Sequence, residues 1–173
     1  MLPIEIHQKK SCCFVGHRKI IVSNELINKL TTTIKDLIIN GITVFNFGSH
    51  SDFDSLCYDI VIKLKSQYNC IITIHYCIPY ENYTATGFTD LYDYEIDCEK
   101  AFKANKKSYM ARNFEMIDNS DICVFYYDKA YTPPRRKNSK KDLTDYQPKS
   151  GTAIAYQYAK QKKKKIINIQ ELL

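Results

Sequence analysis

The 173-residue chain is 45% hydrophobic and 25% charged, with a net charge of +6, which is the composition of a globular protein with one hydrophobic core. No apolar stretch is long enough for a membrane-spanning helix, and the first residues lack the basic and apolar pattern of a signal peptide. We therefore expect one domain, residues 1–173, in the cytoplasm, without a membrane partner.

Apolar runs and helically spaced segments alternate along the chain. An apolar run at 11–15 ends at Gly16, and apolar residues then recur at helical spacing from Ser23, a favourable N-cap, to Gly41. Further strands are expected at 42–47, 70–78, 121–127 and 165–169, and further helices at 52–67, near 91–104, at 109–119 and at 151–161. This order predicts an α/β fold: a Rossmann-like, open, mainly parallel sheet with helices on both faces.

The segment at about 128–149 carries most of the net charge. Between Arg135 and Lys149, six basic residues stand against two acidic ones, which contributes +4 of the +6. Three of the five prolines of the chain also fall in this segment. We expect a mobile basic loop, a solvated insertion rather than a binding face.

The seven cysteines form no C-x-x-C pair, so the usual spacing of zinc ligands is absent. Cys12, Cys13, Cys70, Cys77 and Cys123 lie in apolar runs, where a free cysteine behaves as a small hydrophobic residue. We therefore expect reduced cysteines, no metal site and no cofactor.

Three short polar loops contain glycine and open onto expected helices: Gly16-His17-Arg18, the loop from Gly48 to Asp52, and Ser150-Gly151-Thr152. In a parallel sheet such loops lie at the carboxyl edge of the strands. Helix N-termini there present unpaired N–H groups and a partial positive charge. The arrangement favours a phosphate-bearing ligand.

These loops occur in order with Arg112-Asn113-x-x-Met116-Ile117-x-x-Ser120-Asp121, which precedes a strand. The set resembles the YpsA-like branch of the SLOG superfamily of Rossmann-like domains, whose relatives include the DNA-processing protein DprA and the LOG phosphoribohydrolases. The resemblance implies a pocket for a nucleotide-derived ligand, and a possible homo-oligomer. The implied ligand-binding residues are Gly16, His17, Arg18, Gly48, Ser49, Asp54, Arg112, Asn113, Ser150, Gly151 and Thr152.

Several of these residues also have a structural interpretation. Ser150 and Asp52 are favourable N-caps, and His17 could hold its loop by bonding a backbone carbonyl. Arg112 could be a surface residue of a helix that is buried through Met110, Phe114 and Ile117.

A catalytic carboxylate is missing where the resemblance would place it. LOG-type hydrolases, which resemble this chain, carry a glutamate two positions beyond Gly-Thr, and the similar deoxyribosyltransferases carry one three positions beyond. Residues 153–156 are Ala-Ile-Ala-Tyr. Because a positioned acid–base group contributes about 100- to 10,000-fold in rate, we expect no catalytic residue and a sensor or sequestering protein for a nucleotide-derived molecule.

Two alternatives stay open. One is an N-glycosidic enzyme that takes its carboxylate from Asp54, Glu95, Asp97 or Glu115. The other is a single-stranded nucleic-acid binder, suggested by 14 tyrosines, the basic loop and the resemblance to DprA. Because the tyrosines are scattered through expected strands and helices, the sequence ranks this alternative last and argues against a nucleic-acid partner.

Overall fold

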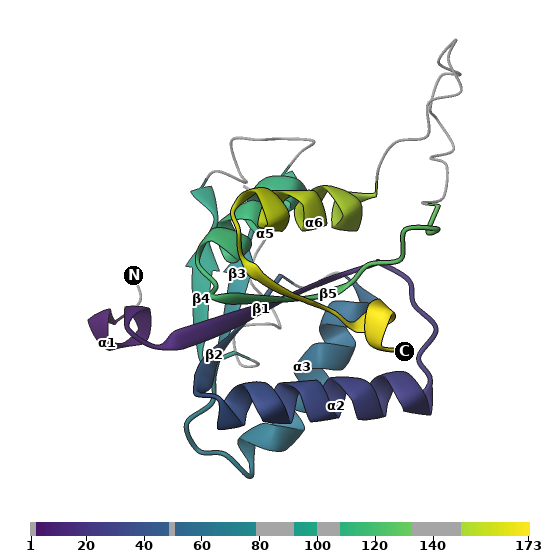
Figure 1. Ribbon diagram of the computed structural model, residues 1–173. Coiled ribbons are helices and arrows are strands. Elements are labelled where there is room, and N and C mark those ends of the chain that lie inside the picture. Colours follow the sequence, from purple (N-terminus) through teal and green to yellow (C-terminus); the bar gives the residue numbers. More distant parts are fainter. Residues whose placement is uncertain (1–2, 49–50, 79–91, 100–107, 133–149) are drawn as a thin grey trace.

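Six parallel strands form one open sheet in the computed structural model, which describes residues 3–48, 51–78, 92–99, 108–132 and 150–173 (Figure 1). Their order across the sheet is β4-β3-β2-β1-β5-β6. Helices cover both faces, so the predicted Rossmann-like α/β class is confirmed. No described helix is both long and apolar enough to cross a membrane.

Apart from β3 and β4, which are separated by residues outside the description, strands and helices follow one another in the alternating order expected of parallel strands joined by crossovers. They are α1 (Ile4–His7), β1 (Lys10–Gly16), α2 (Asn24–Ile39), β2 (Ile42–Phe47), α3 (Asp52–Lys65), β3 (Ile72–Cys77), β4 (Tyr94–Asp97), α5 (Ser108–Asp118), β5 (Ile122–Tyr126), α6 (Gly151–Gln161), β6 (Lys165–Asn168) and the 3-10 turn η2 (Ile169–Leu172).

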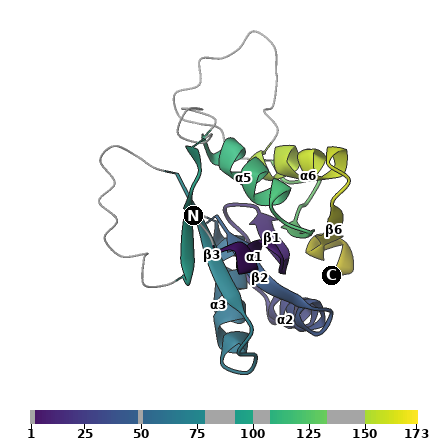
Figure 2. The ribbon, with the colours of Figure 1, turned by 90° about the vertical axis from the view of Figure 1, so that its left-hand side faces the viewer.

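The core has two layers, one on each face of the sheet. Side chains of β1 alternate between them: Cys12 and Phe14 pack with α2 and α3, whereas Cys13 and Val15 pack with α5 and α6. Figures 1 and 2 show these two pairs of helices on opposite sides of the strands. Burial of β1 on both faces explains why its sequence is a continuous apolar run.

The signals that predicted α2 are present in its structure. The Ser23 hydroxyl accepts a hydrogen bond from the Leu26 N–H at 3.1 Å, as an N-cap does. Gly41 follows the helix with a φ of +89°, a conformation that favours glycine.

The helix predicted near 91–104 is wrong at residues 94–97, which form the edge strand β4, whereas Glu99 is helical. Asp93 fixes the start of this strand. Its backbone N–H donates to the Thr73 carbonyl at 3.0 Å, and its carboxylate accepts from the Thr73 N–H at 2.7 Å. Lys65 forms an ion pair with the same carboxylate. Pairing with β3 therefore overrides the weak local preference of this exposed segment.

The cysteines follow the prediction only in part. Cys12, Cys13 and Cys123 are fully buried, as expected of small hydrophobic residues. Cys70 is instead exposed, and Cys77 is half-buried beside polar groups at the end of β3. The predicted mobile loop at 128–149 lies outside the described residues beyond Thr132.

Gly16→Ala is expected to destabilise the fold. A methyl group at Gly16 would lie 2.4 Å from the ring of Phe53, which is fully buried in α3. Overpacking of this kind costs about 1–3 kcal/mol, which lowers the Tm of a chain of this size by roughly 2–12 °C. Thermal unfolding followed by circular dichroism measures the difference.

Gly151→Ala is the matched control, because its added methyl group meets no atom within 4 Å. This variant should keep the Tm of the wild type or raise it slightly. Equal losses of Tm in the two variants would contradict the close contact between Gly16 and Phe53.

Candidate functional site

The chain changes direction across the sheet between β1 and β5, which are neighbours. From β1 it continues into α2 on one face, and from β5 it continues to α6 on the other (Figure 1). In open parallel sheets, ligands bind in the crevice outside the carboxyl ends of such a strand pair. The candidate site is therefore the edge formed by the loops after β1 and β5.

His17 joins these two loops. It is 2% exposed, and its Nε2 accepts a hydrogen bond from the Asp128 N–H at 3.1 Å. The residue thus holds its loop, as the structural alternative expected, but through an amide rather than a carbonyl. Its buried Nδ1 has no hydrogen-bond partner among the described residues. Burial lowers the pKa of His17 and the nearby Asp128 opposes this less strongly, so the ring is neutral at neutral pH.

Aromatic rings surround His17. Tyr131 stacks on it with ring centroids 3.8 Å apart, while Tyr126 and Tyr127 lie 6.4 and 6.3 Å away. Tyr127 also packs against Tyr156 of α6, at 4.6 Å between centroids. We call His17, Tyr126, Tyr127 and Tyr131 the aromatic group. Its three tyrosines are partly exposed and offer flat surfaces on which a nucleic-acid base can stack.

Exposed cationic side chains occupy the same two loops. Arg18 and Lys19 follow β1, and Lys129 follows β5. Lys19 forms an ion pair with Asp52 at 3.2 Å, but both groups face water, so the pair contributes little stability. The Asp52 N–H also donates to the Arg18 carbonyl at 2.9 Å, which ties the loop after β1 to the start of α3.

Arg112 of α5 lies at the carboxyl end of β2. Its Nη1 donates to the carbonyl oxygen of Gly48, and its Nε and Nη2 donate to Oδ1 of Asn113 at 3.3 and 3.0 Å. A Cβ at position 48 would lie 2.8 Å from the guanidinium, so glycine permits this close approach. Gly48, Arg112 and Asn113, which the sequence predicts to share a site, therefore lie together in the structure. Their binding of a ligand stays a prediction.

The alternative that Arg112 is a surface residue is wrong, because it is only 6% exposed. Of the side chains predicted to bury that helix, Ile117 is buried, whereas Met110 and Phe114 are half-buried. The guanidinium takes a place on the inner side of α5 because it has hydrogen-bond partners there.

Polar groups at the ends of the connection between β2 and α3 form hydrogen bonds with one another. Ser51, not Asp52, is the N-cap of α3, and its hydroxyl accepts from the Asp54 N–H at 3.0 Å. The buried Asp54 carboxylate accepts from the Gly48 N–H at 3.3 Å. Asp54 thus has a structural role, and its predicted contact with a ligand is untested. Ser49 lies outside the described residues.

Helix α6 begins at the same carboxyl edge, because it follows β5 and leads back to the start of β6. Ser150 is its N-cap and accepts from the Ala153 N–H at 3.1 Å. Gly151 is exposed and Thr152 is buried. The serine therefore acts as the structural alternative expected, while the helix N-terminus at the exposed Gly151 keeps the geometry that suits an anion.

The opposite, amino edge of the sheet holds a surface pocket of about 650 Å³, whose lining includes Lys10, Asp36, Ile42 and Lys165. The Ser120-Asp121 pair of the motif belongs to this edge. The Asp121 carboxylate accepts from the Ser11 N–H at 2.8 Å and thereby fixes β5 against β1. We place the candidate site at the carboxyl edge because the helix N-termini and glycine loops lie there.

The carboxylates of the enzymatic alternative are dispersed over the structure. Asp54 bonds the β2 loop, and Glu95 lies 3.1 Å from the ring of His75. Asp97 is exposed at the end of β4, and Glu115 is half-buried on α5. No acidic side chain follows Gly151-Thr152 in the first turns of α6, so the chain offers no acid at the position that the resemblance marks for catalysis.

No protein-family model and no curated protein sequence matches this chain. Among solved structures, its fold is similar to that of DNA processing protein A (DprA) from Helicobacter pylori. The TM-score is 0.55 with 14% sequence identity, and the match covers 95% of this chain and 67% of that one. At this identity the likeness shows the fold alone, and the YpsA-like branch stays a prediction.

The argument against a nucleic-acid partner was wrong, because DNA processing protein A, which has this fold, binds single-stranded DNA. The 14 tyrosines are scattered along the sequence. Three of them instead gather around His17, because β1 and β5 are parallel neighbours whose carboxyl ends lie side by side.

The lowered pKa of His17 predicts a specific pH dependence of stability. The unfolded chain takes up a proton on this residue near its ordinary value of 6.5, whereas the folded chain does so only at lower pH. Neutral His17 therefore contributes to the free energy of unfolding above pH 6.5. This contribution is lost as the pH falls through the folded-state pKa. His17→Gln should show a smaller loss of unfolding free energy from about pH 7 to 5, measured by urea denaturation.

His75 is present in both the wild type and the His17→Gln variant, so its effect on the pH dependence cancels. The difference between the two slopes of unfolding free energy against pH therefore reports His17 alone. An identical slope in the variant would mean that His17 titrates normally in the folded chain.

Proposed function

We propose that the chain binds single-stranded DNA at the carboxyl edge of its sheet, between the loops after β1 and β5. The observation that carries this proposal is the aromatic group. Its partly exposed tyrosines lie at the end of β5 and in the loop after it, which also holds the exposed Lys129, and they pack around His17, which precedes the exposed Arg18 and Lys19. Flat rings beside cations are what a nucleic-acid strand without base pairing requires, since its bases stack and its phosphates attract positive charge.

The two kinds of side chain would act on different parts of the strand. Cations neutralise phosphates, release counterions and make affinity fall with salt. Stacking of one base on an aromatic ring contributes about 1–3 kcal/mol and tolerates any base. The net charge of +6 favours a polyanionic partner, and +4 of it belongs to the segment 135–149, which lies outside the described residues. The likeness of the fold to DprA supports this choice of partner.

A nucleotide-derived small ligand, held without catalysis, is the second candidate function. The observation that favours it is the N-terminus of α6 at the same edge, where Gly151 is exposed, because a helix N-terminus suits a single phosphate group. Such a ligand would have little salt dependence and would gain nothing from a longer strand.

Tyr131→Ala is expected to weaken binding of an oligo-dT strand by about 5- to 150-fold, the equivalent of one lost stacking contact. Fluorescence anisotropy with a labelled strand at low salt measures the Kd. Tyr131→Phe is the matched control, because it keeps the ring that stacks on His17 and should keep the wild-type Kd. A wild-type protein that does not bind the strand, or two variants with equal Kd, would overturn the proposal.

A salt titration adds a second arm to the same experiment. Arg18→Ala should reduce the slope of log K against log salt by about 0.7, whereas Lys10→Ala, an exposed cation at the amino edge, should leave it unchanged. Tight, salt-independent binding of mononucleotides with no preference for the strand would instead establish the second candidate.

A further inference from the structure

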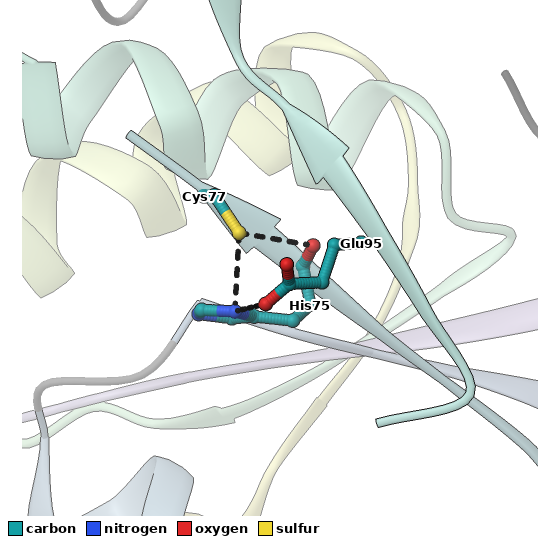
Figure 3. A group of neighbouring side chains, drawn as sticks. All are labelled: His75, Cys77 and Glu95. Atoms are coloured by element: carbon teal, nitrogen blue, oxygen red, sulfur yellow. Dashed lines mark hydrogen bonds and ion pairs between the residues drawn. The ribbon is translucent and has the colours of Figure 1, made fainter. Parts of the chain in front are cut away.

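A second group of polar side chains lies on β3 and β4, away from the aromatic group (Figure 3). His75 and Cys77 share one face of β3, because they are two residues apart. Glu95 of β4 lies directly opposite His75 in the parallel register. Figure 3 shows the three side chains converging on one point between the strands.

The potential ligand atoms of this group lie close enough together to share one metal ion after small side-chain movements. His75 Nδ1 lies 3.1 Å from Glu95 Oε1 and 3.1 Å from Cys77 Sγ, and all three potential ligand atoms lie within 4.8 Å of one another. Ligands at 2.0–2.3 Å from a tetrahedral zinc ion are separated from one another by roughly 3.3–3.8 Å. An ion can therefore enter if the two closer pairs separate by a few tenths of an ångström and the Cys77 sulfur and Glu95 oxygen, which lie within 4.8 Å of each other, approach by up to about 1 Å.

We propose that His75, Cys77 and Glu95 bind one zinc ion. Imidazole nitrogen, thiolate and carboxylate are together the donor types that zinc accepts, whereas magnesium and calcium prefer oxygen alone. The proposal goes beyond DNA binding and is independent of it, because none of the three residues belongs to the aromatic group.

The imidazole is already held in place for this role. The ring of Tyr92 stacks on His75 with centroids 4.8 Å apart and an interplanar angle of 15°. His75 itself is 9% exposed. Burial, with a smaller effect of Arg112, lowers the pKa of His75 and outweighs Glu95, which raises it, so the neutral form that binds metals prevails.

Zinc must displace a proton from the cysteine. Burial, followed by the charges of Glu95 and Asp97, raises the pKa of the Cys77 thiol to about 12, while Arg112 lowers it less. Without an ion the sulfur is therefore protonated. On binding, a Zn–S bond replaces the S–H bond and the proton passes to the buffer. Glu95 and Asp97 offset the positive charge of Arg112 near the ion.

Three protein ligands leave the fourth tetrahedral position open. Zinc sites of this kind hold a water molecule or a ligand atom there, whereas purely structural sites use four protein ligands. The spacing of the cysteines along the sequence predicts no metal site, because the proposed ligands come from two different strands. The helix predicted near 91–104 also separates Glu95 from β3.

Metal-free protein titrated with Zn²⁺ in competition with a chromogenic chelator should bind one ion per chain. Cys77→Ser and Glu95→Gln should each weaken this binding by more than about 100-fold, since even partners outside the ligand set are worth 10- to 100-fold. Cys70→Ser and Glu99→Gln are the matched controls, because both residues are exposed and lie outside the group. Both should retain the wild-type affinity.

Co²⁺ provides a second readout that is specific for the sulfur. The Co²⁺-loaded wild type should show a thiolate-to-cobalt charge-transfer band that survives Cys70→Ser and disappears in Cys77→Ser. The Glu95 side chain is 32% exposed and lies on an edge strand, so Glu95→Gln should fold normally. This variant keeps the test decisive if the cysteine variant does not fold. Absence of stoichiometric zinc binding in the wild type, or wild-type affinity in Glu95→Gln, would overturn the proposal.

Discussion

The common direction of all six strands is the constraint on which the rest of this structure depends. Parallel strands must be joined by crossovers, so every loop that leaves a strand emerges at one edge of the sheet. This brings His17 within hydrogen-bond distance of Asp128, although 111 residues separate them. The order of the strands then places the reversal of the chain between β1 and β5. Both proposed ligands, the DNA strand and the nucleotide-derived molecule, would bind at the carboxyl edge there.

The motif residues at this edge serve the fold first. Gly16 makes room for Phe53, and Gly48 makes room for Arg112, whose guanidinium bonds the backbone of the same loop. A substitution of Arg112 would therefore disturb folding as well as any ligand. The side chains best placed to contact a partner are the exposed Arg18 of the motif and the partly exposed Tyr131 outside it.

The alternating helices and strands were predictable because each has a strong period or a cap of its own: α2 between Ser23 and Gly41 is an example. Strand β4 was not, because its conformation depends on pairing with β3 and on the side-chain contacts of Asp93. The aromatic group and the proposed zinc ligands also depend on strand pairing, so the sequence alone did not reveal them. The aromatic group requires the adjacency of β1 and β5, and the proposed zinc ligands require the register of His75 with Glu95. Neither can be read from local periodicity.

Hydrogen–deuterium exchange with and without an oligo-dT strand tests the central claim most directly, since it reports the position of the bound strand on the whole chain. The account predicts protection of the amides at residues 16–19 and 126–132, on the two loops that flank the reversal between β1 and β5. It predicts no change at the amino edge, where Lys10 and Lys165 line the surface pocket. Protection at that pocket, with none in the two loops, would contradict the account.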